Sequence, residues 1–242
     1  MIADDQLFIR PALFDQFPEL VAAESTRYAG NLGLYTSAPP ETIIDNRQHF
    51  FTQFGIRPTQ VAGARQVHGI AVYVAQQGGQ VEGYDALISN QAGIFVSINV
   101  ADCTPVLVYD PIQGAVAAVH AGWRGTVGKI AYQAILAMQE HFGTRPADCF
   151  AYIGTCIDEC DFEVDEEVAA YFDNSFKKWD KNRKKFLIDL KKTNLSQLTE
   201  AGLNVSRIEI SPYSTVQHNA HFFSHRFEKG KTGRALAIIG RK

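Results

Sequence analysis

Three apolar runs follow one another with very little chain between them, and this spacing limits the possible folds more than any other feature. They cover residues 94–100 (IFVSINV), 105–109 (PVLVY) and 114–119 (GAVAAV). Short apolar runs bounded by turn residues are typical of buried strands. The connection at 110–114 (DPIQG) is short and contains Pro and Gly, so it predicts a hairpin between the second and third runs.

The predicted hairpin brings a cysteine near a histidine. Pairing Tyr109 with Ala115 sets a register in which Cys103, in the corner before the second run, lies near His120. Near-opposite side chains on antiparallel strands are about 5 Å apart, close enough for a thiolate and an imidazole to share one metal ion or one proton. Cys103 can therefore be a metal ligand or a nucleophile activated by His120, and the plainer alternative is a small buried apolar residue.

Two further motifs extend this candidate site. RQVHG at 65–69 places His68 in a loop that leads into a predicted strand at 69–75. Two imidazoles and one thiolate are a typical zinc ligand set with a fourth position left open, although His68 taken alone is read as a structural loop residue. AGWRGT at 121–126 puts glycines at a strand-to-helix junction, where backbone N–H groups can approach an anion.

Charged and aromatic residues in or near these motifs are candidates for substrate binding. Arg65, Arg124 and Arg226 are interpreted as phosphate ligands, with ordinary surface ion pairs as the alternative. Asp102 is the acidic residue nearest to the predicted site and is a candidate substrate ligand. Trp123 is interpreted as a core residue, with stacking on a base as the alternative.

A second histidine group lies near the C-terminus. His218, His221 and His225 have the i, i+3, i+7 spacing of one helix face, so a second metal site is considered there. The aromatic and turn-rich sequence that follows argues against a helix. Cys156 and Cys160 are four residues apart in a loop-like segment, which favours free thiols or packing over a zinc pair.

The remaining pattern indicates a mixed-sheet α/β or α+β fold rather than a regular βαβ alternation. Helices are predicted over residues 42–54, 127–142, 164–172 and 195–201. Further strands are predicted over residues 150–153, 208–210 and 235–239. The segment 176–192 contains eight Lys or Arg residues and is interpreted as a solvated face. A chain of 242 residues without repeats or linkers suits one domain, residues 1–242.

Composition excludes several function classes. The formal net charge of −3 argues against a general nucleic-acid or acidic-membrane binder. The N-terminus, MIADDQLFIR, is acidic and lacks the apolar core of a signal peptide, and no apolar stretch reaches transmembrane length. A cytoplasmic protein is therefore expected. Four cysteines are too few and too unevenly spaced for a disulfide framework.

Several motifs resemble one known family. RQVHG, ADCTPVL and AVHAGWRGT, in this order, together with IGTCIDECDFEV (153–164) and FFSHRFEKGKTGR (222–234), are similar to the YfiH (DUF152, Cu-oxidase-4) family of laccase-domain proteins. The resemblance implies a layered sandwich of mixed β-sheets flanked by helices, like the catalytic domains of cytotoxic necrotizing factors. It also implies that His68, Cys103 and His120 are both the metal ligands and the catalytic residues.

The resemblance further implies an activity. Members are described as zinc enzymes that split purine nucleosides with phosphate into base and ribose 1-phosphate, acting on adenosine, inosine or methylthioadenosine as a monomer or homodimer. Adenosine deamination, polyphenol oxidation with copper and editing of peptidoglycan precursors are also ascribed to them. The chain departs from the usual pattern at Thr155, at Cys160-Asp161, at Ser214-Thr215 and at His225-Arg226, and none of these positions is one of the three ligands. A cysteine amidase and a non-catalytic nucleoside-binding protein stabilised by zinc remain alternatives.

Two of these activities can be checked against the residues. Multicopper oxidases gather many imidazoles, commonly in His-x-His pairs, but this chain has seven histidines and no such pair. Copper in place of zinc would still fit a histidine–cysteine–histidine site. The nucleobase-deaminase signature is also missing, because no Glu stands two residues after His68 or His120 and no Pro-Cys-x-x-Cys occurs. A deamination would need another base, and Asp102 is the nearest candidate.

Overall fold

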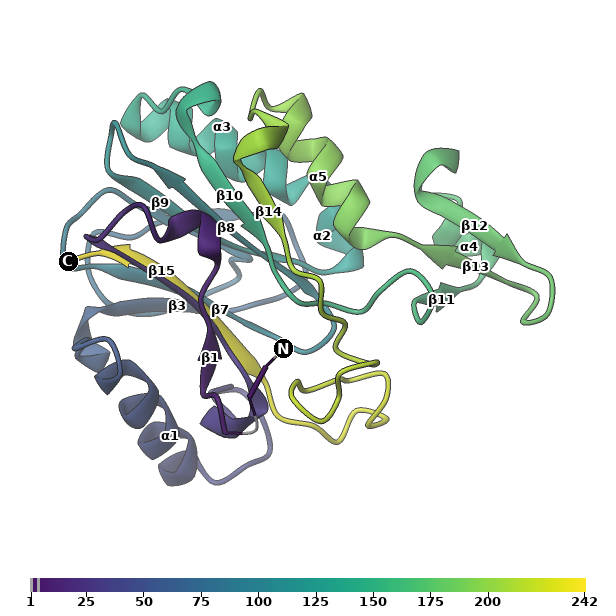
Figure 1. The fold of residues 1–242 in the computed structure, drawn as a ribbon, viewed down its shortest axis with the longest axis horizontal. Helices are drawn as coiled ribbons and strands as arrows, with labels where there is room; N and C mark the ends of the chain where they lie inside the picture. The colour runs from purple at the N-terminus through teal and green to yellow at the C-terminus, as the bar shows by residue number, and fades with distance from the viewer. Residues whose placement is uncertain (1, 4) are drawn as a thin grey trace.

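Two six-stranded mixed sheets pack face to face in the computed structural model, which describes residues 2, 3 and 5–242 (Figure 1). The first sheet has the order β1-β2-β15-β7-β3-β5 and the second β14-β10-β8-β9-β6-β4. The first consists of β1 (Phe8–Ile9), β2 (Leu20–Ser25), β15 (Ala235–Arg241), β7 (Phe95–Val100), β3 (Val61–Arg65) and β5 (Gly79–Glu82). The second consists of β14 (Ile208–Ile210), β10 (Phe150–Ile153), β8 (Thr104–Asp110), β9 (Ala115–Ala121), β6 (Ala86–Ser89) and β4 (Val72–Val74).

Helices cover the outer face of each sheet and complete a layered sandwich, as the resemblance implied (Figure 1). Helix α1 (Pro40–Thr52) packs on the first sheet, and α3 (Ile130–Phe142) and α5 (Leu190–Glu200) pack on the second. Strands in the middle of such a sandwich bury both faces, which explains why they have continuous apolar runs instead of alternation. In β8, Leu107 faces the core between the sheets while Val106 and Val108 face the helices.

The predicted central hairpin is confirmed, but its predicted register is wrong by one residue. Tyr109 pairs with Val116, and His120 pairs with Pro105. The Asp110 carboxylate accepts the N–H groups of Ile112 and Gln113, and this turn keeps Asp110 itself paired in the ladder. The observed register places Cys103 two residues before the partner of His120, directly before β8.

Several other predicted elements have different bounds. The predicted helix 127–142 is α3, which begins three residues later, because Lys129 adopts a left-handed φ of 59° just before it. The short helix α2 (Trp123–Val127), which precedes Lys129, was not predicted. The predicted helix 164–172 is mostly wrong, since only α4 (Glu166–Ala169) is helical and β11 (Glu163–Val164) precedes it. The strand predicted at 69–75 is reduced to β4. Strands β1, β2, β3, β5 and β6 were not predicted, and α5 begins at Leu190, well before the predicted helix 195–201.

The lysine-rich segment is not merely a solvated face. It forms β12 (Lys177–Asp180) and β13 (Lys185–Ile188), which join β11 in a small third sheet that projects from the sandwich (Figure 1). Lys185 pairs with Asp165, and Arg183 lies 3.7 Å from the Glu163 carboxylate. The basic strands are therefore partly neutralised by the acidic segment that precedes them. In the described part of the chain, no helix combines the length and the apolar character needed to cross a membrane.

One buried carboxylate joins the ends of the two large sheets. Glu24 on β2 is 1% exposed, and it accepts hydrogen bonds from the Thr155 N–H at 2.9 Å and the Tyr152 hydroxyl at 3.1 Å. Burial raises the pKa of Glu24 to about 7, although these two hydrogen bonds oppose the shift. Glu24 is therefore mostly protonated below neutral pH in the folded protein.

This shift predicts a pH-dependent stability. Glu24 binds its proton more tightly in the folded state than in the unfolded chain, so its stabilising contribution is complete at acid pH and is lost as the pH rises from 4.5 to about 7. Between about pH 5.5 and pH 8, the wild type is expected to lose about 2 kcal/mol of unfolding free energy relative to Glu24→Gln. Urea unfolding of both proteins with a metal chelator present measures this difference, and parallel pH profiles would contradict it.

Candidate metal centre

The three predicted ligands come together at the end of the central hairpin. Cys103 lies in the corner between β7 and β8, His120 lies on β9, and His68 lies in the loop between β3 and β4. One donor atom from each side chain lies within 4.8 Å of the other two. Among the described residues, this is the one group of three or more His, Cys, Asp or Glu side chains close enough to hold a metal ion.

A fourth residue, Asp85, organises this cluster and was missed by the sequence analysis. Its fully buried carboxylate accepts the N–H groups of Val67, His68 and Gly69 at 3.1, 2.9 and 2.7 Å. The same carboxylate lies 2.8 Å from Nδ1 of His120. Burial would raise the pKa of Asp85, but the imidazole and the backbone donors lower it, so the carboxylate is ionised and can only accept.

This arrangement sets the direction of both imidazoles. Because the Asp85 carboxylate can only accept a hydrogen bond, Nδ1 of His120 carries the hydrogen that it shares with Asp85. Nε2 of His120 is then the atom that faces the cluster and can bind a metal ion. His68 has a left-handed φ of 61°, and the three N–H bonds to Asp85 hold its loop in that conformation. The sequence contained one signal, since Asp85 stands directly before the apolar run 86–88 (ALI).

The thiol of Cys103 is ionised in this setting. Burial would raise its pKa, but the charge and hydrogen bonds of His120 and His68 outweigh burial and lower the pKa to about 6. Burial would likewise lower the pKa of His120, but Cys103 and Asp85 raise it to about 9. Without a metal ion, Cys103 and His120 are thus a thiolate and an imidazolium at neutral pH, and a metal ion such as zinc would take the place of the Nε2 proton of His120. The same pair also suits a nucleophile. The donor set therefore fits the metal that the resemblance implied.

Gly122 leaves room for this cluster. A Cβ atom at position 122 would lie 2.9 Å from Cδ2 of His68 and 3.2 Å from Sγ of Cys103. The backbone of Gly122 is in an ordinary extended conformation, with φ at −66°, so the need for glycine is one of space. Gly122→Ala should therefore crowd the donor atoms.

We expect Gly122→Ala to weaken zinc binding about tenfold or more, because crowding of a packed site costs about 1–3 kcal/mol. Titration against a competing chelator measures the affinity. Without metal, the variant should have an unfolding free energy close to that of the metal-free wild type, because the His68 side chain can move when no metal is bound. A wild-type zinc affinity in Gly122→Ala would contradict this account of the site.

The cluster lines a cavity of about 580 Å³, and the other lining residues include both apolar and positively charged side chains. One wall is largely apolar and consists of Trp123, Ile157, Phe162 and Leu190. Three arginines also line the cavity, namely Arg65, Arg226 and Arg234, and the Arg226 guanidinium lies over the Phe162 ring, 5.6 Å from its centroid. A cavity with apolar and cationic parts suits a ligand that joins a flat ring to an anion.

Two of these arginines keep their charge available. The Arg226 guanidinium donates to the backbone carbonyls of Asp161 and Glu163 at 3.2–3.3 Å. The Arg234 guanidinium donates to the backbone carbonyls of Thr232 and Gly233 at 3.1 and 2.9 Å. Backbone carbonyls fix a guanidinium without cancelling its charge, so both side chains can still bind an anion.

The other predicted substrate ligands differ in their placement. Arg65 lines the cavity at an exposed position, 3.8 Å from the Glu82 carboxylate. Asp102 also lines the cavity, but its carboxylate oxygens already accept hydrogen bonds from the protein. Arg124 is not among the lining residues, and its guanidinium lies over the ring of Trp123, 4.3 Å from the centroid. Trp123 itself lines the cavity.

The C-terminal histidines form no second cluster among the described residues. Their segment consists of turns rather than a helix, so the i, i+3, i+7 spacing does not place them on one face. Nδ1 of His218 lies 3.1 Å from the Ser214 nitrogen, the His221 ring packs near Tyr28, and His225 lines the cavity. The free thiols of Cys156 and Cys160 also lie outside the metal-capable group.

The fold and the cluster define a class of protein, namely a mixed α/β sandwich with one histidine–cysteine–histidine group in an arginine-lined cavity. The chain belongs to the multi-copper polyphenol oxidoreductase laccase family, whose model matches residues 22–242. This match confirms the resemblance drawn from the motifs. The family's description mentions several coppers, whereas the described residues offer a single group of three donors.

Similar proteins carry related names. The chain is 31% identical over 251 residues to a protein of Geobacillus stearothermophilus named purine nucleoside phosphorylase YlmD, covering 93% of this chain and 92% of the relative. It is 32% identical to a protein from an unknown prokaryotic organism named adenosine deaminase RL5, over 89% of this chain and 88% of that one. The crystal structure of YlmD from Geobacillus stearothermophilus superposes with a TM-score of 0.92 at 28% identity, covering 100% of this chain and 98% of that one.

Proposed function

We propose that this protein is a zinc-dependent purine nucleoside phosphorylase that converts adenosine, inosine or methylthioadenosine and phosphate into base and ribose 1-phosphate. The observation that carries the proposal is the placement of the His68–Cys103–His120 cluster beside both an apolar wall and two uncancelled arginines in one cavity. The name of the relative YlmD supports the same reaction.

The three clustered side chains are the proposed metal ligands. His68, Cys103 and His120 would hold one zinc ion, which would supply a Lewis acid beside the substrate. Asp85 keeps the Nδ1 hydrogen of His120 in place, so Nε2 stays directed at the cluster. Copper is a second candidate occupant of the same ligands, with weak polyphenol oxidation as a side activity.

Different lining residues would bind the two substrates, phosphate and the purine nucleoside. Arg226 and Arg234 would bind phosphate through their free donors, with Arg65 at the exposed rim. The purine would lie against Trp123, because the ring of Phe162 is largely buried and already faces the Arg226 guanidinium. In this pose a phosphate oxygen bonds to C1′ of the ribose as the bond from C1′ to the base breaks, and the base leaves with the electron pair and takes up a proton.

The test is product analysis with and without phosphate. Inosine with phosphate is expected to give hypoxanthine and ribose 1-phosphate in equal amounts, and inosine without phosphate is expected to remain intact. Release of free ribose would indicate a hydrolase instead. Adenosine in the same assay reports any deamination, the activity that the name of RL5 indicates for that relative.

A second candidate function is supported by the low pKa of the Cys103 thiol. A thiolate beside His120 is the arrangement of a cysteine amidase, and cell-wall precursors are the substrates to test. This function predicts turnover that a chelator leaves intact and that alkylation of Cys103 stops. Retention of turnover after alkylation would exclude it.

A further inference from the structure

We propose that Asp102 is a positioning residue that holds the turn carrying Arg226 and thereby sets the affinity for the anionic co-substrate. The sequence alone predicts a different role for Asp102, namely a substrate ligand or a base. The proposal rests on the proposed function for the identity of the anion, phosphate. It rests on the contacts of Asp102 for everything else.

Asp102 has a backbone conformation that residues other than glycine rarely adopt. Its φ is 80°, in the left-handed region, and it directly precedes Cys103 in the connection between β7 and β8. A non-glycine residue in this region is strained and persists only where surrounding contacts stabilise it. The hydrogen bonds of Asp102 therefore stabilise this corner.

Three separate segments bind this one residue. The backbone oxygen of Asp102 accepts the N–H of Ile157 at 3.0 Å. Its carboxylate accepts the Thr215 hydroxyl at 2.5 Å through Oδ1 and the backbone N–H of Arg226 at 2.6 Å through Oδ2. Ile157 and Arg226 both line the cavity, so the carboxylate links the corner beside Cys103 to the turn of Arg226.

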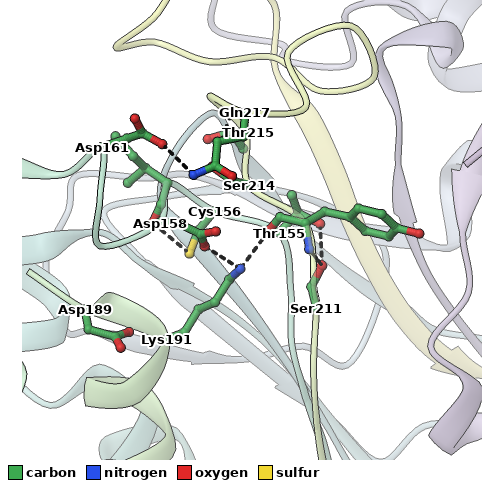
Figure 2. A network of polar contacts seen from close by, with 12 residues as sticks. Thr155, Cys156, Asp158, Asp161, Asp189, Lys191, Ser211, Ser214, Thr215 and Gln217 are labelled. Atoms are coloured by element: carbon green, nitrogen blue, oxygen red, sulfur yellow. Dashed lines mark hydrogen bonds and ion pairs between the residues drawn. The ribbon is translucent and has the colours of Figure 1, made fainter. Parts of the chain in front are cut away.

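The partner at Oδ1 is held firmly. Figure 2 shows the polar network between segments 155–161 and 211–217, in which Lys191 bonds to Asp158 at 2.6 Å and to the Tyr213 carbonyl at 2.7 Å. Thr215 also donates its N–H to the Cys156 carbonyl at 3.0 Å. Oδ1 of Asp102 thus accepts a hydrogen bond from a residue that the network holds in place, and Oδ2 binds the start of the turn that carries Arg226.

The contacts also argue against a direct chemical role. Each carboxylate oxygen already accepts a short hydrogen bond from the protein, and both donors are neutral groups. The Arg226 guanidinium points to other partners, the carbonyls of Asp161 and Glu163. Asp102 therefore positions Arg226 through its backbone and does not form an ion pair with its side chain.

A double-mutant cycle on the zinc-loaded protein tests the proposal. Asp102→Asn replaces the charged acceptor of the Arg226 N–H with a neutral amide oxygen, which forms a weaker hydrogen bond, so we expect the KM for phosphate to rise about tenfold with kcat nearly unchanged. Arg226→Ala should raise the same KM at least as much. Because both act through one turn, the double variant should be no worse than Arg226→Ala alone. Thr215→Val, which removes only the other hydrogen bond, should give a smaller rise.

Calorimetric titration with inorganic phosphate measures the same coupling without turnover. If phosphate binds with this coupling but no nucleoside is split, the proposed function is wrong and the role of Asp102 stands. The role of Asp102 is overturned if the two effects multiply, if kcat falls while the KM is unchanged, or if Asp102→Asn loses zinc. In those cases Asp102 acts on the chemistry or on the metal centre.

Discussion

Cys103→Ala is expected to lose stoichiometric zinc binding and to lower kcat/KM for inosine phosphorolysis about 1000-fold or more. The variant leaves two imidazoles, which are a weaker set than two imidazoles with a thiolate. Lewis-acid stabilisation worth several kcal/mol disappears with the metal, and each 1.36 kcal/mol is a factor of ten in rate. Elemental analysis of the purified variant and steady-state kinetics measure the two effects.

Cys149→Ala is the matched control for this variant. Cys149 is a fully buried free cysteine that lies outside the cluster. Mainly because of this burial, the pKa of its thiol is raised to about 12, so the thiol stays neutral. We expect it to keep zinc and activity while losing some stability. Full zinc occupancy and full activity in Cys103→Ala would contradict the assignment of Cys103.

Asp85→Asn is expected to weaken zinc binding and lower activity about 10–100-fold, the usual effect of losing the partner of a metal-bound imidazole. The asparagine oxygen can replace only some of the four acceptor contacts, and its NH₂ group meets donors that had faced a carboxylate. Both imidazoles lose their fixed direction as a result. Zinc titration with a competing chelator and measurement of kcat/KM report the two effects.

Asp110→Asn separates this role from general burial. Asp110 is also a fully buried aspartate of the second sheet that accepts two backbone N–H groups, but it lies at the hairpin turn. The control should lose stability without losing zinc affinity. If both variants lost zinc affinity equally, Asp85 would matter for the fold alone.

The central part of the site could be predicted from the sequence because it depends on local rules. A short connection between two apolar runs predicts a hairpin, and a hairpin places Cys103 near His120 whatever small error affects its register. The register itself was wrong, because the Asp110 side chain bonds within the turn and keeps one more residue pair in the ladder.

Residues that act through long-range contacts could not be predicted in this way. Asp85 lies 17 residues from His68 and 35 from His120, and no local pattern shows that one carboxylate serves both. The lysine-rich segment of β12 and β13 was predicted as a solvated face because no local pattern shows that Arg183 and Lys185 pair with the distant Glu163 and Asp165. The C-terminal histidines gave a false helical signal, because their chain is held in turns.

The most direct test of the central claim is phosphorolysis of inosine by metal-free and zinc-restored protein. The chain should lose phosphate-dependent release of hypoxanthine when the metal is removed by chelation. Added zinc should restore that activity in proportion to occupancy, reaching a maximum near one ion per chain. Metal-free protein that splits inosine with phosphate at the full rate would contradict the account.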